Sequence, residues 1–320
     1  MRNLFWFILL AVIMSVPVSA QDEITLADLA DEDGLFADIN GASIYYIARG
    51  NPDDSAVMLI HGFGGSTFTW RDTIDVLVDA GYYVVAFDLP PFGLSDKSPE
   101  LDYSRRAYAD IVAGLMDELS IETATIVGHS MGGSTTAYFA VAYPERVDKL
   151  VFVAGGVFEA SSANDNEDTA SSGGSPLGFL SGIDLDSEQA VFIIETALIP
   201  ATFASIIETA YFDSSIMTDE VVAGYARPIL TDNWGAGFIA YLNAVDENPI
   251  SMDDLVEAVD MPVLIMWGEE DTWVPIEMGL MMDEVLANST LITYANVGHL
   301  PMEETVDAFN TDLIAFLNQQ

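Results

Sequence analysis

Hydrophobic positions along the chain alternate between short continuous runs and longer helical stripes. Residues 57–60 and 82–87 are short apolar runs typical of buried strands, and residues 69–80 between them have a helical pattern. After Ser104, a plausible cap, apolar side chains recur every four residues at 111, 115 and 119, which predicts a further helix. Strand and helix in alternation predict a mostly parallel sheet with helices on both faces.

The same alternation extends toward both ends of the chain. Two strands at 35–39 and 42–48 are expected to pair through the turn at Asn40-Gly41. Two groups of residues, 21–156 and 261–320, are therefore predicted to form the two parts of one α/β core. The remaining strands are expected at 124–127, 150–153, 262–267 and 291–294, and the remaining helices at 131–143, 276–286 and 303–317.

The alternation stops between residues 157 and 260. Residues 159–175 are polar, acidic and rich in glycine, a composition typical of a surface loop. Residues 188–211 and 221–245 are rich in Ala, Ile, Leu and Phe at helical spacing. Since this segment separates two predicted strands, we expect a helical lid over one edge of the sheet. The sequence leaves open whether the acidic loop gates the site.

A separate apolar segment precedes the core. Residues 1–20 combine Arg2, an apolar run from Leu4 and a small-residue site at 18–20, a pattern typical of a cleaved signal peptide. The run stops at Ser15, short of the roughly 20 residues that span a membrane, so no stable membrane anchor is expected after cleavage. The sequence therefore predicts a secreted or periplasmic protein.

The chain is strongly acidic. It has 51 Asp and Glu against 9 Lys and Arg, a formal net charge of -42, and no cysteine. This charge argues against nucleic acid and anionic membranes as partners. The acids are spread along the chain, which indicates a solvated acidic surface, and a saline habitat explains it as well as a bias toward acidic secreted proteins. No cofactor and no metal ion are expected, and the oligomeric state is left open.

Candidate chemistry begins in the stretch IVGHSMGGSTTAYFA at residues 126–140. Gly128-His129-Ser130-Met131-Gly132 matches the pattern GxSxG between a predicted strand and a predicted helix. A nucleophile on such a turn needs strained backbone angles and close neighbouring chain, which side chains at the two glycines would obstruct. Ser130 is therefore the candidate nucleophile, and the alternative is a serine that only caps the helix.

A serine hydroxyl needs a base to take its proton, and the chain has three histidines. His129 is expected to point away from the Ser130 hydroxyl and to pack or form a hydrogen bond inside the fold. His61 opens the glycine-rich loop 61–65 and is expected to hold it. His299 follows the last predicted strand, at the edge where open α/β sheets bind ligands, and is the candidate base.

A carboxylate must orient the imidazole of the base and offset the positive charge that it acquires. The stretch WGEEDTWVP at 267–275 follows a predicted strand and precedes His299. Asp271 is preferred to Glu269 and Glu270 because it lies deeper in the turn, although spacing alone excludes neither neighbour.

Five motifs together resemble the α/β-hydrolase superfamily, in particular its lid-bearing serine hydrolase branch. The resemblance covers essentially the whole mature chain and implies an eight-stranded, mostly parallel sheet with helices on both faces and a helical lid. The motifs are HGFGG at 61–65, DLPPFGLS at 88–95, GHSMGG at 128–133, WGEEDTWVP at 267–275 and VGHLP at 297–301.

The resemblance also implies roles for individual residues. Ser130 is expected to be the nucleophile, His299 the base and then the acid, and Asp271 the orienting carboxylate. The backbone amides of Phe63 and Met131 are expected to form the oxyanion hole.

The motif at 88–95 departs from the family at one position, where Pro91 stands in place of the usual glycine. We expect Pro91 to reshape a turn near the pocket and to leave the catalytic residues untouched. Asp88 in the same motif is expected to accept structural hydrogen bonds.

The residues around the nucleophile favour one chemistry within the superfamily. Dehalogenases and epoxide hydrolases have an aspartate where Ser130 stands. Carbon–carbon bond hydrolases keep the serine but commonly have Asn before it and Trp after the histidine, where this chain has His129 and Leu300. The sequence thus favours a carboxylesterase or lipase-like enzyme that cleaves hydrophobic esters through an acyl-enzyme. A carbon–carbon bond hydrolase, a lactonase or perhydrolase, and a non-catalytic binding protein are the alternatives.

Aromatic side chains of the predicted lid favour a small to medium hydrophobic ester as the substrate, although many of them are needed for the core of the lid. They are Phe192, Phe203, Tyr211, Phe212, Trp234, Phe238 and Tyr241.

Overall fold

A computed structural model describes residues 24–157, 185, 187, 189–197, 200–231 and 234–319 of the chain. The predicted signal peptide at 1–20 and the predicted acidic loop at 159–175 lie outside the described residues.

Eight strands form one sheet in the order β1-β2-β4-β3-β5-β6-β7-β8. β1 pairs antiparallel with β2 and β2 antiparallel with β4, whereas every pair from β4 to β8 is parallel. The predicted fold class is therefore confirmed. The strands are Leu35–Ile39 (β1), Ala42–Arg49 (β2), Ala56–Ile60 (β3), Tyr83–Phe87 (β4), Ala124–His129 (β5), Val147–Val153 (β6), Val263–Gly268 (β7) and Ser289–Tyr294 (β8).

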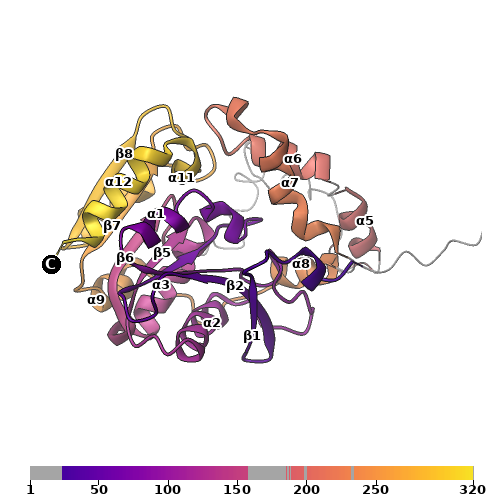
Figure 1. Cartoon of the computed structure of the whole chain (residues 1–320), viewed down its shortest axis with the longest axis horizontal. Coiled ribbons are helices and arrows are strands. Elements are labelled where there is room, and N and C mark those ends of the chain that lie inside the picture. Colours follow the sequence, from indigo (N-terminus) through magenta and orange to yellow (C-terminus); the bar gives the residue numbers. More distant parts are fainter. Residues whose placement is uncertain are drawn as a thin grey trace, which may run out of the picture.

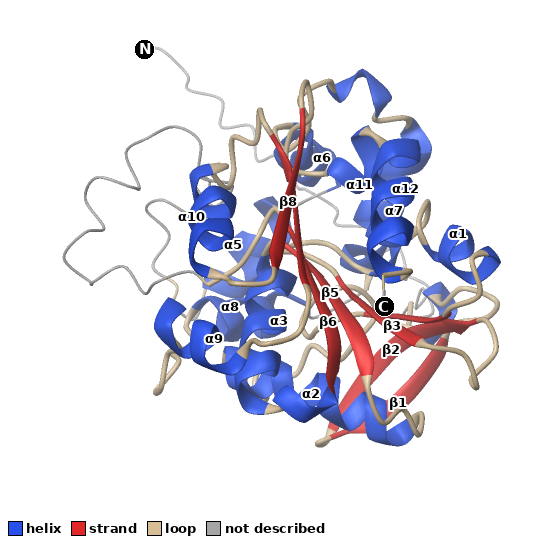
Figure 2. Cartoon of the chain, turned by 90° about the vertical axis from the view of Figure 1, so that its left-hand side faces the viewer, coloured by secondary structure: helices blue, strands red, loops and turns tan. Residues whose placement is uncertain are grey.

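Helices cover both faces of the sheet (Figures 1 and 2). On one face lie Ile74–Asp79 (α1), Pro301–Glu304 (α11) and Val306–Leu317 (α12). On the other lie Arg105–Glu118 (α2), Met131–Ala142 (α3), Met252–Ala258 (α9) and Glu277–Val285 (α10). Short 3-10 turns in the described residues are Ala27–Leu29 (η1), Thr67–Trp70 (η2), Pro144–Arg146 (η3), Ser214–Ile216 (η5) and Arg227–Leu230 (η6).

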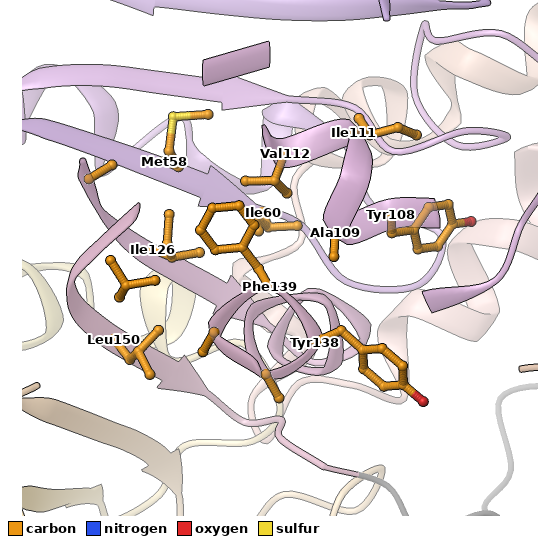
Figure 3. Packing of buried hydrophobic residues seen from close by; sticks show 14 of the residues in the cluster. Met58, Ile60, Tyr108, Ala109, Ile111, Val112, Ile126, Tyr138, Phe139 and Leu150 are labelled. Carbon is orange, nitrogen blue, oxygen red and sulfur yellow. The ribbon is translucent and has the colours of Figure 1, made fainter. Parts of the chain in front are cut away.

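Strand β3 shows why the two faces need cover. All five of its residues are buried, and their side chains alternate between two hydrophobic clusters. Val57 and Leu59 pack with α1 and α12, while Met58 and Ile60 pack with α2 and α3, next to Ile126 (Figure 3). A strand that is apolar on both sides belongs in the middle of a covered sheet.

Among the described residues, five α-helices lie between β6 and β7, where the sequence predicts the lid: α9 and, before it, Ala190–Ala197 (α5), Pro200–Glu208 (α6), Asp219–Ala226 (α7) and Trp234–Leu242 (α8). We call α5, α6, α7 and α8 the inserted helices. α5 packs on α8 and α6 on α7, to one side of the sheet (Figure 1). α9 instead packs on α3, and the Ile250 amide before it donates to the Tyr138 hydroxyl at 3.2 Å. None of the helices in the described residues is both long and apolar enough to cross a bilayer.

Two predicted helices are each divided in the structure. The segment 69–80 contains the end of η2 and then α1, because the Thr67 amide is held by the Asp88 carboxylate at 2.6 Å and this sets a separate turn. The segment 303–317 contains the end of α11 and then α12, with non-helical backbone at Thr305 (φ -138°, ψ 53°). Thr305 and Val306 are both β-branched, which weakens a helix at this point.

Candidate active site

Ser130 lies on a sharp turn between β5 and α3. Its backbone angles are φ 53° and ψ -116°, an arrangement that costs a non-glycine residue about 1–3 kcal/mol. Gly132 permits the turn, because a Cβ atom there would lie 2.5 Å from the carbonyl oxygen of Ile60. The Ser130 side chain forms no capping hydrogen bond to α3. The alternative that Ser130 only caps the helix is therefore wrong, and its conformation is that of a nucleophile turn.

Asp271 and His299 are in direct contact. The imidazole Nδ1 donates to Asp271 Oδ2 at 2.7 Å, and both side chains are almost fully buried. Asp271 Oδ1 accepts from the amides of Trp273 and Val274 at 2.8 and 2.9 Å. Because Nδ1 carries the donated proton, Nε2 is left as an acceptor, and it has no partner among the described residues. This is the state in which an imidazole can take a proton.

The neighbouring acids bind elsewhere. Glu269 accepts from the Thr293 hydroxyl at 2.8 Å, and Glu270 accepts from the Val297 amide at 3.0 Å. Of the three acids in the turn, Asp271 is the one that meets His299, as the sequence preferred.

His129 connects the serine turn to the loop of His299. Its Nε2 donates to the His299 carbonyl at 2.9 Å, and the two rings lie 4.7 Å apart. Burial, followed by the nearby His299, holds the pKa of His129 well below its ordinary value, so the ring is neutral. In the described part of the chain, no hydrogen bond joins the Ser130 hydroxyl to His299. The structure thus places the serine turn against the histidine loop through the residue that precedes Ser130.

The glycine-rich loop after β3 approaches the same turn. A Cβ atom at Gly62 would lie 2.9 Å from the Cβ atom of Ser130, so only glycine allows this approach. His61 Nδ1 donates to the Gly62 carbonyl at 2.7 Å and Nε2 accepts from the Leu89 amide at 2.9 Å, which holds the loop as predicted. Burial lowers the pKa of His61 to about 4.

The predicted oxyanion donors sit on either side of this contact. Within the described residues, neither the Phe63 amide nor the Met131 amide donates a backbone hydrogen bond. Unoccupied amides beside a candidate nucleophile are what an oxyanion hole requires.

Asp88 has the structural role that the sequence predicts. Its two carboxylate oxygens accept from the amides of Thr67 and Leu94, each at 2.6 Å, and burial raises its pKa to about 6. Lys97 lies nearby and donates to the carbonyls of Gly93, Pro91 and Ser95 at 2.6, 3.1 and 3.2 Å. Burial lowers the pKa of Lys97 to about 8.

A narrow apolar cavity of about 50 Å³ lies between the core loops and the inserted helices. Core residues that line it include Phe63, Phe92 and Pro91, so the departure at Pro91 does fall at the pocket. Lys97 is the one charged residue of the lining. The inserted helices contribute Phe203, Ile206, Ile207, Tyr225, Trp234 and Phe238, and the turn η6 contributes Pro228 and Ile229.

Not all the aromatic residues of the predicted lid face this cavity. Phe203, Trp234 and Phe238 line it, but Phe192 and Phe212 are 70% and 51% exposed. Tyr241 packs on Phe63 and Phe92, and the Tyr211 hydroxyl donates to Glu303 at 2.6 Å.

A second cavity of about 20 Å³ adjoins His299 and His129. It shares Phe63, Ile207 and Tyr225 with the larger cavity, and also Trp273. The shared walls connect the apolar cavity to the imidazole. No group of His, Asp and Glu in the described ranges is arranged to hold a metal ion.

Trp273 is a site residue that sequence reasoning missed. Its ring lies 5.2 Å from the His299 ring at 34°, and its amide binds Asp271. The signal was its place two residues after Asp271. A tryptophan therefore contacts the histidine of this chain, although it comes from the loop after β7 and not from position 300.

Residues 55–306 match the family model described as the α/β hydrolase fold. The chain belongs to this family. The match covers most of the core and all the inserted helices, and it confirms the resemblance and the hydrolase class.

Several relatives of this hydrolase are named for one kind of substrate. The 2-hydroxy-6-oxononadienedioate/2-hydroxy-6-oxononatrienedioate hydrolase of Pseudomonas sp is 30% identical over 285 residues, which is 88% of this chain and 93% of that protein. The 2-hydroxy-6-oxo-6-phenylhexa-2,4-dienoate hydrolase of Comamonas testosteroni is 28% identical and covers 88% of this chain and 94% of its own. The uncharacterized hydrolase YugF of Bacillus subtilis is 28% identical over 87% of this chain and 96% of its own.

One protein among the similar solved structures is also named for this kind of substrate. A meta-cleavage product hydrolase, CumD, matches with a TM-score of 0.68 and 25% identity, over 90% of this chain and 98% of its own.

The prediction of an ester-cleaving enzyme is contradicted by these comparisons. The named relatives are carbon–carbon bond hydrolases, the class that the sequence kept as an alternative. That class was set aside because of His129 and Leu300. At these positions His129 donates to the His299 backbone carbonyl, and a tryptophan ring, that of Trp273, contacts His299 from the loop after β7.

Proposed function

We propose that this hydrolase cleaves the carbon–carbon bond next to the ketone of a 2-hydroxy-6-oxo-2,4-dienoate. The observation that carries the proposal is the set of relatives named for such substrates, which align over most of their own length. The buried contact between Asp271 and His299 beside a strained Ser130 supports it.

The proposed reaction begins when Ser130 Oγ adds to the C6 carbonyl and His299 Nε2 accepts the hydroxyl proton. The amides of Phe63 and Met131 would stabilise the oxyanion. Cleavage also requires that the dienol first ketonises: the 2-hydroxyl loses its proton and C5 gains one, so that C5 becomes a CH₂ group and the 2-oxo group is conjugated with C3=C4. When the intermediate collapses, the C5–C6 bond breaks and its electron pair is delocalised through C3=C4 into the 2-oxo group as a dienolate. His299 returns the proton to the dienolate oxygen, which gives the 2-hydroxy-2,4-dienoate product, and water then hydrolyses the acyl-enzyme to a carboxylic acid.

The cavity favours substrates with an apolar group on C6. Its lining is aromatic and aliphatic except for Lys97, whose ammonium already donates to three carbonyls. A single cation can offset one substrate carboxylate by its field, whereas a dioate would leave a second carboxylate in apolar surroundings at a high cost. We therefore expect a 6-phenyl or 6-alkyl substrate to be preferred to the dioate.

The test is turnover of 2-hydroxy-6-oxo-6-phenylhexa-2,4-dienoate by the mature protein. Loss of the conjugated chromophore is followed in time, and the products are identified by mass spectrometry as benzoate and 2-hydroxypenta-2,4-dienoate. Ser130→Ala is expected to lower kcat on the order of 10⁶-fold while the thermal unfolding transition stays cooperative. A folded wild-type protein that leaves this compound, its 6-alkyl analogues and the dioate intact would overturn the proposal.

A further inference from the structure

Two consecutive glutamates, Glu303 and Glu304, occupy the end of α11, close after His299. Glu304 Oε1 accepts from the Gly298 amide at 2.9 Å and, more weakly, from the Leu300 amide at 3.4 Å. These amides flank His299 on both sides. Glu304 Oε2 accepts from the Phe212 amide at 2.8 Å. One carboxylate therefore joins the loop of the candidate base to the chain that follows α6.

We call residues 209–212 at the end of α6 the docking segment. It makes three further contacts with the loops that carry Asp271 and His299. The His299 amide donates to the Ala210 carbonyl at 2.7 Å. The Thr272 hydroxyl donates to the Thr209 carbonyl at 3.3 Å, and Trp273 Nε1 donates to the Thr209 hydroxyl at 3.0 Å. Both loops are thus attached to the same four residues of the insertion.

The His299 loop and the docking segment also pack closely, in addition to forming hydrogen bonds. A Cβ atom at Gly298 would lie 2.5 Å from the Ala210 carbonyl oxygen and 2.7 Å from the Phe212 nitrogen. Real Cβ atoms do not approach so closely, so any side chain at position 298 would push the docking segment away.

Glu303 attaches the insertion at neighbouring points. Its buried carboxylate accepts from the Tyr211 hydroxyl and from Arg71 Nη2 at 2.6 and 2.7 Å, and from the Tyr225 hydroxyl. Tyr225 lines both cavities. Glu303 therefore holds a wall of the pocket, whereas Glu304 holds the backbone on either side of His299.

Glu303 and Glu304 differ in whether a positively charged side chain pairs with the carboxylate. Arg71 pairs with Glu303, but the ion pairs of the described residues include none to Glu304. Burial raises the pKa of Glu304, against the opposing effect of the amides that it binds. Its partners are backbone amides from two separate segments, and satisfying both at once requires an acceptor on each oxygen.

We propose that Glu304 is a positioning residue: its carboxylate holds the His299 loop on the docking segment, so that the inserted helices determine where the imidazole lies. The inference rests on the proposed function in taking His299 as the base. It extends that function by making the geometry of the base depend on the insertion.

The experiment compares Glu304→Gln with the wild-type protein. Glutamine keeps the size of the side chain but presents an NH₂ group to one of the two amides. Because the imidazole is displaced and the pocket wall is kept, we expect kcat to fall on the order of 10-fold with little change in KM. The rate of Ser130 phosphonylation at saturating phosphonate ester, measured by mass spectrometry, is expected to fall by a similar factor. The downfield proton resonance of the His299–Asp271 hydrogen bond should shift or broaden.

Two other variants act as contrasts. Glu303→Gln is expected to raise KM more than it lowers kcat, because it loosens Tyr225 and leaves the amides around His299 satisfied. Glu257→Gln, an exposed change on α9, is expected to alter neither parameter.

Gly298→Ala keeps the Glu304 carboxylate but forces the docking segment away from the His299 loop. If Glu304→Gln does not fold, this variant tests the positioning role in its place. We expect the same fall in kcat and in phosphonylation. If folded Glu304→Gln or Gly298→Ala phosphonylates at the wild-type rate with an unchanged downfield resonance, the positioning role is wrong. Phosphonylation needs no dienoate, so a wild-type protein that reacts with the phosphonate but not with the dienoate would contradict the proposed function alone.

Discussion

The two sides of the candidate active site are built in different ways. On the nucleophile side, the Ser130 amide donates to the Val153 carbonyl of β6, the His61 ring accepts from the Leu89 amide beside Asp88, and Gly62 packs against Ser130. On the base side, the loops of Asp271 and His299 bind residues 209–212 of the insertion.

The difference concerns which part of the fold controls each reacting group. The position of Ser130 follows from β5, β6 and the close packing at Gly62 and Gly132, all within the core. The position of His299 depends in addition on residues 209–212, which belong to the insertion and to none of the strands of the sheet. We infer that the nucleophile is set by the core and the base is adjusted by the insertion.

The largest expected effect is on kcat, and it should appear on replacing Asp271 but not on replacing the other buried aspartate, Asp88. Asp271→Asn is expected to lower kcat on the order of 10⁴-fold, since an amide favours the wrong tautomer of His299, while stability changes little. Asp88→Asn leaves the site chemistry in place but loses an acceptor for one of two short amide bonds, so the free energy of unfolding should fall by about 1–3 kcal/mol. Steady-state kinetics and denaturant unfolding of both variants provide the check. If both lost activity alike without loss of stability, the two sides of the site would not differ as described.

Acid should destabilise the core through His61. Its pKa is about 4 in the folded protein against 6.5 ordinarily, so the unfolded chain binds more protons between these values and stability is lost as pH falls from 6.5 to about 4. The expected loss is about 3 kcal/mol. His129 acts in the same direction. Asp88, with its pKa raised to about 6, acts in the opposite direction, because its contribution is lost as pH rises.

The measurement is denaturant unfolding of the wild-type protein and His61→Gln from pH 4 to 7. The variant should show a shallower decline toward acid than the wild type. Parallel curves would show that His61 is not held neutral by the fold.

The strained serine predicts a smaller gain in stability. Ser130→Gly is expected to raise the free energy of unfolding by about 1 kcal/mol relative to Ser130→Ala, because glycine adopts positive φ without a Cβ clash. Thermal unfolding of the two inactive variants, side by side, measures the difference. Equal stability would mean that the turn stores no strain.

The smallest expected effect tests the link between the insertion and Trp273. Thr209→Val removes the acceptor of the indole N–H at the surface, a hydrogen bond worth about 1 kcal/mol or less, so kcat should fall a few-fold. Thr209→Ser keeps the hydroxyl and should retain wild-type kcat. Identical kinetics for the two variants would show that the hydrogen bond between Thr209 and Trp273 does not affect the position of His299.

Local pattern was sufficient for most of the fold. The apolar runs of β3 and β4, the Asn40-Gly41 turn and the Ser104 cap of α2 follow from spacing and propensity, which act over a few residues. The divided helices at 67–79 and 301–317 did not follow, because one depends on a carboxylate that is distant in sequence and the other on a break inside an otherwise helical pattern.

Local sequence pattern predicted only part of the candidate active site. The sequence by itself determined the sharp turn at Ser130 between strand and helix, because GxSxG is a local constraint on the backbone. It also identified Asp271 and His299 as candidates, and the fold then brought this pair into contact. Only the tertiary structure decided that Trp273 lies against the imidazole and that Glu304 joins it to the insertion. These contacts join segments up to about 90 residues apart, and hydrogen bonds of that range depend on how whole elements pack, which no local pattern records.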